Sequence, residues 1–387
     1  MRIGTGSGAF RLCLLSLLLL GLGVMTPVWA EGAEEPEQHG EVLEAVVGYV
    51  QEEQEIEVMG QRQLYQRLEL IVVSGPRRGE RIVVENGAIP EAHPRRYRAG
   101  ERVFVRAFEN GSTTAYVLDS PSRWMPLIGI VGIFVLVVAL VSRWRSVPAL
   151  FGLGLSFAVL FVFVLPQLSA GAPPLRTILI GGALIVPLTF YLAHGVSLKT
   201  TIAVVGTALA LALTVLLAQG FVHLTDLSGY ASEEAGFLQA QNPGALNIRG
   251  LLVAGIVVGV LGVLDDVTIS QAAVVQQLHR ANSQLSSREL FTRAMRVGQD
   301  HIASVVNTLA LVYAGAALPL LLLLRTSPLP WRYLLSQEII AEEIVRMMVA
   351  SIGLMTAVPI TTFLAAEAMT LAARWLALDQ GPRPDTF

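Results

Sequence analysis

Two adjacent carboxylates, Asp265 and Asp266, lie in the stretch "GVLGVLDDVTISQAAVV" (259–275), within a strongly apolar part of the chain. The apolar run before them, Leu251–Leu264, is roughly 21 Å long as a helix at ~1.5 Å per residue, which is shorter than the ~30 Å hydrocarbon core of a bilayer. A helix crossing here carries the acids into the membrane, where each costs about 2.5–3.5 kcal/mol at a helix centre. Acids in such a place are usually turned inward, paired or hydrated, and they mark a functional site.

Helical spacing puts small and polar residues on the same faces as the two acids. The small residues are Gly255, Gly259 and Gly262. The polar residues that continue the stripe are Thr268, Ser270 and Gln271. Small residues predict that neighbouring helices approach closely beside the acids, which would then face the bundle or an internal cavity rather than lipid. The alternative is a pair that caps a short span at the cytoplasmic surface and has no further role.

Two later apolar segments could complete an oxygen-rich site for a proton or a hard cation. The candidate residues are Asp300, His301, Asn307 and Thr308 in the first segment, and Thr361 and Thr362 in the second. Pro359 precedes the two threonines, and a proline kink there would free a backbone carbonyl for an ion. Pro187 predicts a simple packing kink.

An ion pair is predicted near the outer end of the last segment. Glu342 and Glu343 precede Arg346 by four and three residues, and such residues are neighbours on a helix surface.

These side chains require an apolar helical scaffold, and the composition provides one. Of the 387 residues, 53% are hydrophobic and only 15% are charged, whereas soluble domains carry about 25% charged residues. Seven spans of near-membrane length follow residue 124: 125–142, 147–168, 177–194, 201–221, 249–271, 302–324 and 344–367. We therefore predict an α-helical polytopic integral membrane protein with about seven transmembrane helices in residues 124–387.

A polar, β-rich segment precedes the spans. Residues 31–123 contain β-branched runs at 67–75, 80–87, 101–111 and 113–120, separated by Gly, Pro and Asn-Gly turn signals, with one or two earlier strands in "AVVGYVQEEQEIEVMG". This pattern predicts a small N-terminal β-barrel-like domain, OB-like or SH3-like. Its isolated histidines, His39 and His93, are predicted to be surface residues.

Residues 1–30 are typical of a signal peptide, with Arg2 and Arg11 before an apolar core at 12–24 and "VWA" ending at Ala30. An uncleaved anchor is the alternative, and both place residue 31 outside. The single cysteine, Cys13, lies in this segment. Lys and Arg concentrate in alternate connections, which predicts an extracytoplasmic β-rich domain and a cytoplasmic C-terminus in a bacterial plasma membrane.

The chain resembles the YibE/F-like family of bacterial multi-pass membrane proteins. The stretches that carry the resemblance are "GVLGVLDDVTISQAAVVQQLH", "ELFTRAMRVGQDHIASVVNTLALVYAGAALPLLLLL" and "EEIVRMMVASIGLMTAVPITTFLAA". The family usually has an acid at the position of Gln277 and an arginine at that of Gln299, so a charge pair there does not transfer to this chain. The resemblance implies architecture and location but no mechanism.

Three functions compete. The first is a transporter or channel for a cation, or for a small polar solute coupled to protons, built on Asp265 and Asp266. The second is a membrane scaffold, sensor or assembly factor that binds a cell-envelope partner through the outer β domain. The third is an intramembrane enzyme, which we do not favour because adjacent acids on a helix point about 100° apart, and only Asp300 or Glu367 could be the second acid. We expect no cofactor other than a bound cation, and no nucleic-acid partner.

Overall fold

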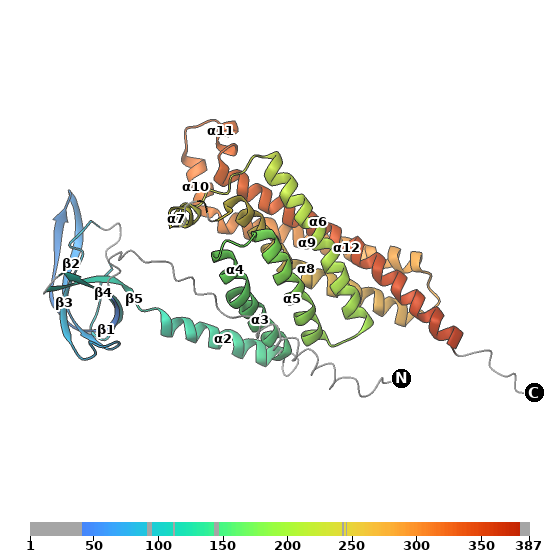
Figure 1. Cartoon of the computed structure of the whole chain (residues 1–387), viewed down its shortest axis with the longest axis horizontal. Coiled ribbons are helices and arrows are strands. Elements are labelled where there is room, and N and C mark those ends of the chain that lie inside the picture. The colour runs from blue at the N-terminus through green and yellow to red at the C-terminus, as the bar shows by residue number, and fades with distance from the viewer. Residues whose placement is uncertain are drawn as a thin grey trace, which may run out of the picture. The chain divides into compact units, whose positions relative to one another are not determined.

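The computed structural model describes residues 41–90, 95–110, 113–142, 147–241, 244 and 246–379 (Figure 1). The predicted signal peptide, residues 1–30, lies outside these ranges, as do His39 and His93. The chain separates into two units, Val28–Val141 and Ser142–Phe387 with Met1–Pro27, and each is described on its own.

The described part of the first unit begins with five antiparallel strands. They are β1 (Glu41–Val58), β2 (Gln61–Val72), β3 (Arg81–Asn86), β4 (Arg102–Asn110) and β5 (Thr113–Pro121), in the spatial order β3-β2-β1-β4-β5. The first third of β1 pairs with β4, and most of its length pairs with β2. Met59 and Gly60, both at positive φ, form the tight turn that joins β1 to β2. The sequence-predicted strands are therefore present.

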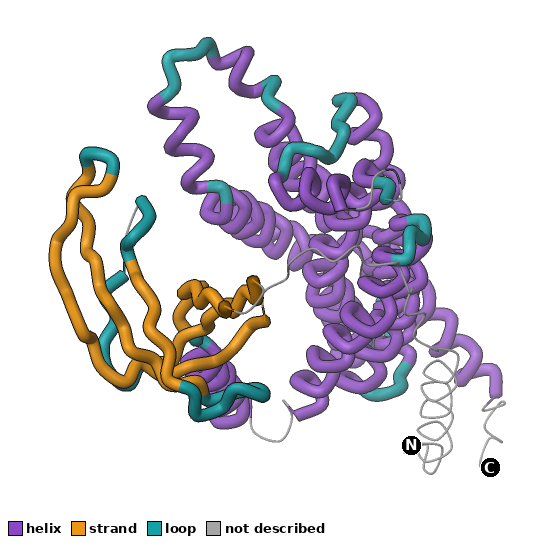
Figure 2. Tube along the Cα trace, turned by 60° about the vertical axis from the view of Figure 1, so that its left-hand side comes forward, coloured by secondary structure: helices purple, strands orange, loops and turns teal. Residues whose placement is uncertain are grey.

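The sheet curls around its own apolar face (Figure 2). Alternate residues of β1 to β4, such as Leu43, Leu68 and Val103, are fully buried, as strand periodicity requires. The edge strands β3 and β5 contact each other, and Tyr116 of β5 donates a 2.8 Å hydrogen bond to Glu80, just before β3. Burial, together with this hydrogen bond, raises the pKa of the Tyr116 hydroxyl.

Helix α2 (Trp124–Ser142) follows the strands in the same unit. It corresponds to the first predicted span, and nearly all of its described side chains are exposed although they are almost uniformly apolar. Exposed apolar side chains along a whole helix are typical of a helix that faces lipid or other helices.

The second unit is helical throughout its described part. Its elements are α3 (Val147–Val159), the π-helix η2 (Leu160–Val164), α4 (Leu165–Ser169), α5 (Pro174–His194), α6 (Leu198–Leu224), α7 (Glu233–Gln241), α8 (Ile248–Ala281), α9 (Ser287–Ala316), α10 (Leu318–Thr326), α11 (Trp331–Leu335) and α12 (Glu338–Asp379). The central helix is α8, which packs against α5, α6, α9 and α12. The largest apolar core of the unit lies among these helices.

Within the described residues, six helices are long and apolar enough to cross a membrane, or seven if α9 and α10 form one span. Six of the seven predicted spans coincide with unbroken runs of helix. The predicted span 302–324 is instead divided by a 69° bend between α9 and α10. Pro319, in the first turn of α10, lacks the N–H that would continue the α9 hydrogen-bond ladder.

Helix α9 begins well before its predicted span. Ser286 caps it in a reciprocal capping box with Glu289, and the helix then continues without a break to Ala316. The connection from α8 is therefore short.

Candidate functional site

A cavity of about 520 Å³ lies between α3 with η2, α5 and α8. Its polar lining residues are Ser156, Thr189, His194, Asp265 and Asp266. The rest of the lining is aliphatic, aromatic or glycine. The cavity is thus apolar, with two carboxylates from α8 among its few polar groups, a composition found in sites for small ligands.

Asp265 is the residue in this cavity that most requires a partner. Its side chain is half-buried, and its Oδ1 atom is buried without any hydrogen-bond partner in the part of the chain that the structure describes. Leaving a buried polar atom unpaired costs about 1–3 kcal/mol, and more when it is charged. The neighbouring Asp266 lines the same cavity but is exposed. A proton or a cation on Asp265 would remove this penalty.

The cavity exists because α5 and η2 approach closely while α8 leaves space beside them. A side chain on Gly181 of α5 would start 2.8 Å from Val164 of η2, so only glycine allows this contact. On α8, a Cβ at Gly262 would have no neighbour within 4 Å. π-helical turns such as η2 are rare and are frequently found at functional sites.

The prediction of close helix packing at the glycines beside the acids is wrong. A side chain at Gly255 or Gly262 would meet nothing within 4 Å, and one at Gly259 would meet only the Tyr313 hydroxyl, at 3.7 Å. These glycines lie on an exposed stripe of α8. Their small size therefore opens space along α8 instead of bringing another helix against it.

The predicted polar stripe after the acids turns away from the cavity. Thr268 is fully buried, and its hydroxyl lies 2.7 Å from that of Thr207 on α6. Gln271 donates from Nε2 to Thr362 on α12 at 2.7 Å and to the Ala294 carbonyl on α9 at 3.1 Å. These residues connect helices, whereas Ser270 is exposed. None of them lines the cavity.

The residues predicted to complete the site on α9 do not reach Asp265. All of them are exposed and absent from the cavity lining: Asp300, His301, Asn307 and Thr308. Their side of α9 differs from the side that packs on α8 and α12, where Ala294 and Gly298 are buried. The structure brings Asp265 and Asp266 together with α3 and α5 instead.

Thr361 and Thr362 of α12, both predicted site residues, contribute to helix packing, and Thr362 does so by accepting the hydrogen bond from Gln271. Thr361 is fully buried against Gly206 of α6, and its hydroxyl has no described hydrogen-bond partner. Helix α12 continues through Pro359 without interruption, as α5 does through Pro187. Both prolines are thus placed inside long helices.

The predicted ion pair on α12 is present between two of its three members. Arg346 donates from Nη1 to Glu343 at 3.0 Å. Glu342 is buried, and its Oε1 atom has no described hydrogen-bond partner.

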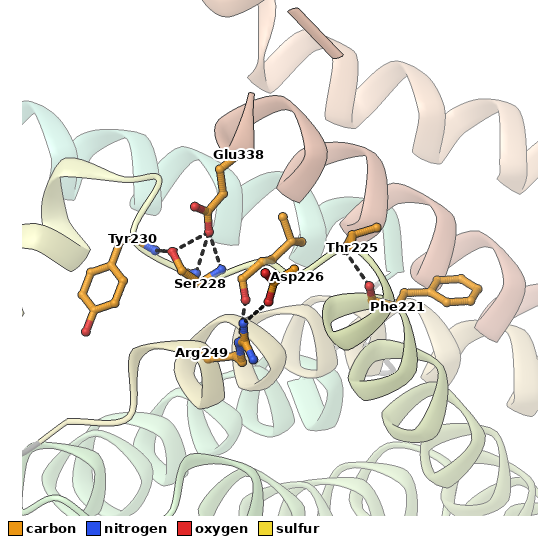
Figure 3. Close-up of polar contacts among 9 residues, drawn as sticks. Phe221, Thr225, Asp226, Ser228, Tyr230, Arg249 and Glu338 are labelled. Carbon is orange, nitrogen blue, oxygen red and sulfur yellow. Dashed lines mark hydrogen bonds and ion pairs between the residues drawn. The ribbon is translucent and has the colours of Figure 1, made fainter. Parts of the chain in front are cut away.

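A clamp at the start of α12 was not predicted (Figure 3). The Oε1 atom of Glu338 accepts from the Ser228 hydroxyl at 2.7 Å and from the Gly229 N–H at 2.9 Å. Arg249 of α8 holds the same loop by donating to the Leu227 carbonyl at 2.6 Å and to Asp226 at 2.9 Å. Nothing local in the sequence joins these segments.

Sequence reasoning also missed His194, which ends α5 and lines the cavity. A histidine at the end of an apolar span could have been noted as a candidate from the sequence. The sequence does not show which helix that histidine faces.

The described residues contain no cluster of three or more His, Cys, Asp or Glu side chains that could hold a metal ion.

Comparisons with known proteins give one match. The family model described as YibE/F-like protein matches residues 130–371, which is more than half of the chain and includes the cavity and most of α12. No curated protein and no solved structure matches the chain.

Proposed function

The chain belongs to the YibE/F-like family, and from this premise we propose that it is a multi-pass membrane transporter that moves a proton or another small cation through its helical unit. Six or seven apolar helices of spanning length support membrane insertion. The orientation that fits best has the β-rich unit outside and the C-terminus in the cytoplasm, because lysines and arginines concentrate in the connections on one side.

The observation that carries the proposal is the unpaired, buried Oδ1 atom of Asp265 at the cavity. Ionisable residues inside apolar helices usually mark ion or proton pathways. A carboxylate that alternates between a bound and a free state is the simplest device for carrying a positive charge. One carboxyl group is enough to hold a proton, whereas a hard divalent cation needs six or more oxygen ligands.

The character of the cavity suggests the solute that would accompany the proton. Apart from its few polar groups the lining is apolar, and Phe157 and Phe190 contribute aromatic rings. A small organic cation fits such a site, since aromatic faces attract cations and a carboxylate neutralises them. The solute that we propose is therefore a small organic cation that is partly apolar, which is a narrower class than the small polar solute predicted from the sequence.

The proposal is tested with the full chain in lipid vesicles that contain a trapped pH indicator. A proton gradient is imposed, and small quaternary ammonium ions are supplied because they cannot cross the bilayer as neutral species. We expect the protein to dissipate the gradient faster than protein-free vesicles do, either alone or with one of these ions. Equal rates with and without the protein across the whole panel would favour the scaffold function instead.

We assign the β-rich unit a separate role in the proposal, which is to bind a partner. Its curled sheet, with β3 and β5 in contact, suits the OB type of small barrel better than an open sheet. Such barrels bind ligands on their strand faces and loops, so this unit is the candidate site for a cell-envelope partner.

A further inference from the structure

A second carboxyl group of the helical unit is buried without a full set of partners, far along the sequence from the cavity. Glu342 of α12 is only 7% exposed, and its Oε1 atom has no hydrogen-bond partner among the described residues. Arg346, one helical turn later, has a buried Nε atom that is also without a described partner. Two unsatisfied groups of opposite charge thus lie at the spacing that brings helix residues together.

The neighbouring acids show that this arrangement is not a general feature of the region. Glu338 is satisfied as a carboxylate, because it accepts hydrogen bonds from Ser228 and Gly229 (Figure 3). Glu343 is satisfied by its 3.0 Å ion pair with Arg346. Glu342 differs from both in being the most buried and in keeping an oxygen free.

The charged and titratable groups around Glu342 are few. Glu338, Glu343 and Arg346 act on it from its own helix, and the backbone N–H of Ala231 faces it from the loop before α7. The charges of Glu343 and Arg346 act electrostatically on the Tyr313 hydroxyl of α9. Arg249, which pairs with Asp226, acts electrostatically on Glu338. Arg346 contacts only Glu343, so in this conformation a charge on Glu342 would have no hydrogen-bonded counter-charge among the described residues. Such charges are strongly disfavoured in protein interiors.

We infer that Glu342 carries a proton in this conformation and that Arg346 is a switch, able to contact Glu343 alone or Glu343 and Glu342 together. When Glu342 loses its proton to water, the Nε–H of Arg346 can donate to the freed Oε1 while Nη1 keeps its bond to Glu343. When Glu342 regains a proton from water, the Nε–H contact is released. Residues at i,i+3 and i,i+4 are both within reach of one arginine.

Tyr313 of α9 lies near both the switch and helix α8. Its hydroxyl lies beside Gly259, on the exposed glycine stripe of α8 that continues to Gly262 in the cavity lining. Gly259 precedes Asp265 by about 9 Å along the helix axis, at ~1.5 Å per residue. Glu342 would thus load or release protons on the outer side, and Asp265 would do so at the cavity. This role in transport rests on the proposed function, whereas the proton on Glu342 does not.

The test is an infrared difference spectrum, acid minus alkaline, of the full chain in lipid vesicles. We expect the carbonyl band of protonated carboxyl groups to lose the intensity of one group in Glu342→Gln. The matched control is Glu233→Gln, which removes an exposed acid in the first turn of α7 and should leave the part of the band that comes from apolar surroundings unchanged. An unchanged band in Glu342→Gln, or the same loss in Glu233→Gln, would overturn the inference.

A second variant covers the case in which Glu342→Gln does not assemble. Glu342→Asp keeps the acid but moves it, so the band should remain and shift in frequency, and an unshifted band would count against the assignment. The vesicle flux assay separates the two proposals. Wild-type protein that shows the Glu342 band but no flux refutes transport alone, and flux with a band indifferent to Glu342→Gln refutes the proton on Glu342 alone.

Discussion

Asp265→Asn is expected to reduce ion-driven flux to the level of protein-free vesicles. Asparagine has nearly the same shape as aspartate but can neither ionise nor carry a proton. Every cycle that loads a positive charge on residue 265 therefore stops. The measurement is the decay of an imposed proton gradient in vesicles that contain equal amounts of wild-type or variant protein.

The same variant should fold at least as well as the wild-type protein. The Oδ1 atom of Asp265 is buried without a partner, and a neutral amide reduces the cost of an unpaired buried charge. Lost flux with unchanged or raised thermal stability would identify residue 265 as part of the transport mechanism. Lost flux with lost stability would not.

Two matched controls locate the effect in the cavity. Asp300→Asn makes the same chemical change on α9, where the residue is exposed and does not line the cavity. Thr268→Val alters α8 one turn after Asp265, at a hydroxyl that contacts Thr207 instead of the cavity. Both should keep most of the flux, and Thr268→Val should cost about 0.5–1.5 kcal/mol of stability. Full flux in Asp265→Asn would refute the role of Asp265.

Gly353→Leu is expected to have the largest effect on stability. Helices α6 and α12 cross through two reciprocal contacts, Gly206 against Thr361 and Gly353 against Thr214. A Cβ at either glycine would lie 2.5 Å from the threonine hydroxyl oxygen opposite, which is too close for any side chain. Overpacking of this kind costs about 1–3 kcal/mol, and more when both helices must move.

Gly255→Leu is the matched control for this prediction. It makes the same substitution in a neighbouring long helix, at a glycine where an added Cβ would meet none of the described residues within 4 Å. The midpoint of thermal unfolding in detergent should fall for Gly353→Leu and Gly206→Leu but not for Gly255→Leu. A comparable loss in Gly255→Leu would mean that the assignment of packing glycines is incorrect.

The glycines illustrate how far sequence alone could lead. Helical spacing placed Gly255 and Gly262 on the face of Asp265 and placed Gly259 and Gly262 on that of Asp266, whereas all three glycines lie with Asp266 on one exposed stripe of α8. It could not show whether that face meets another helix or open space, because that depends on how helices far apart in the sequence are rotated and arranged. The close contacts occur at Gly206 and Gly353, which lie on helices whose mutual register no local pattern encodes.

The candidate site, like the glycines, could be predicted from the sequence only in part. Length and hydropathy were enough to single out Asp265 and Asp266, and the structure places both at a cavity. The helices that face them are α3 and α5, not α9 and α12 as predicted. Gln271 and Thr362 were predicted to belong to the cation site, but the hydrogen bond between them joins α8 to α12. The bend at Pro319 was visible in the sequence and should have been predicted.

The most direct test of the central claim uses the unmodified chain and a hydrophobic carbodiimide, which reacts with protonated carboxyl groups in apolar surroundings. Reconstituted protein is treated at acidic pH, the modified residues are mapped by mass spectrometry, and flux is measured on the same samples. We expect Asp265 to be modified and the remaining flux to fall in proportion to the modified fraction. Flux that persists when Asp265 is fully modified would contradict the claim that this carboxyl group carries the transported charge.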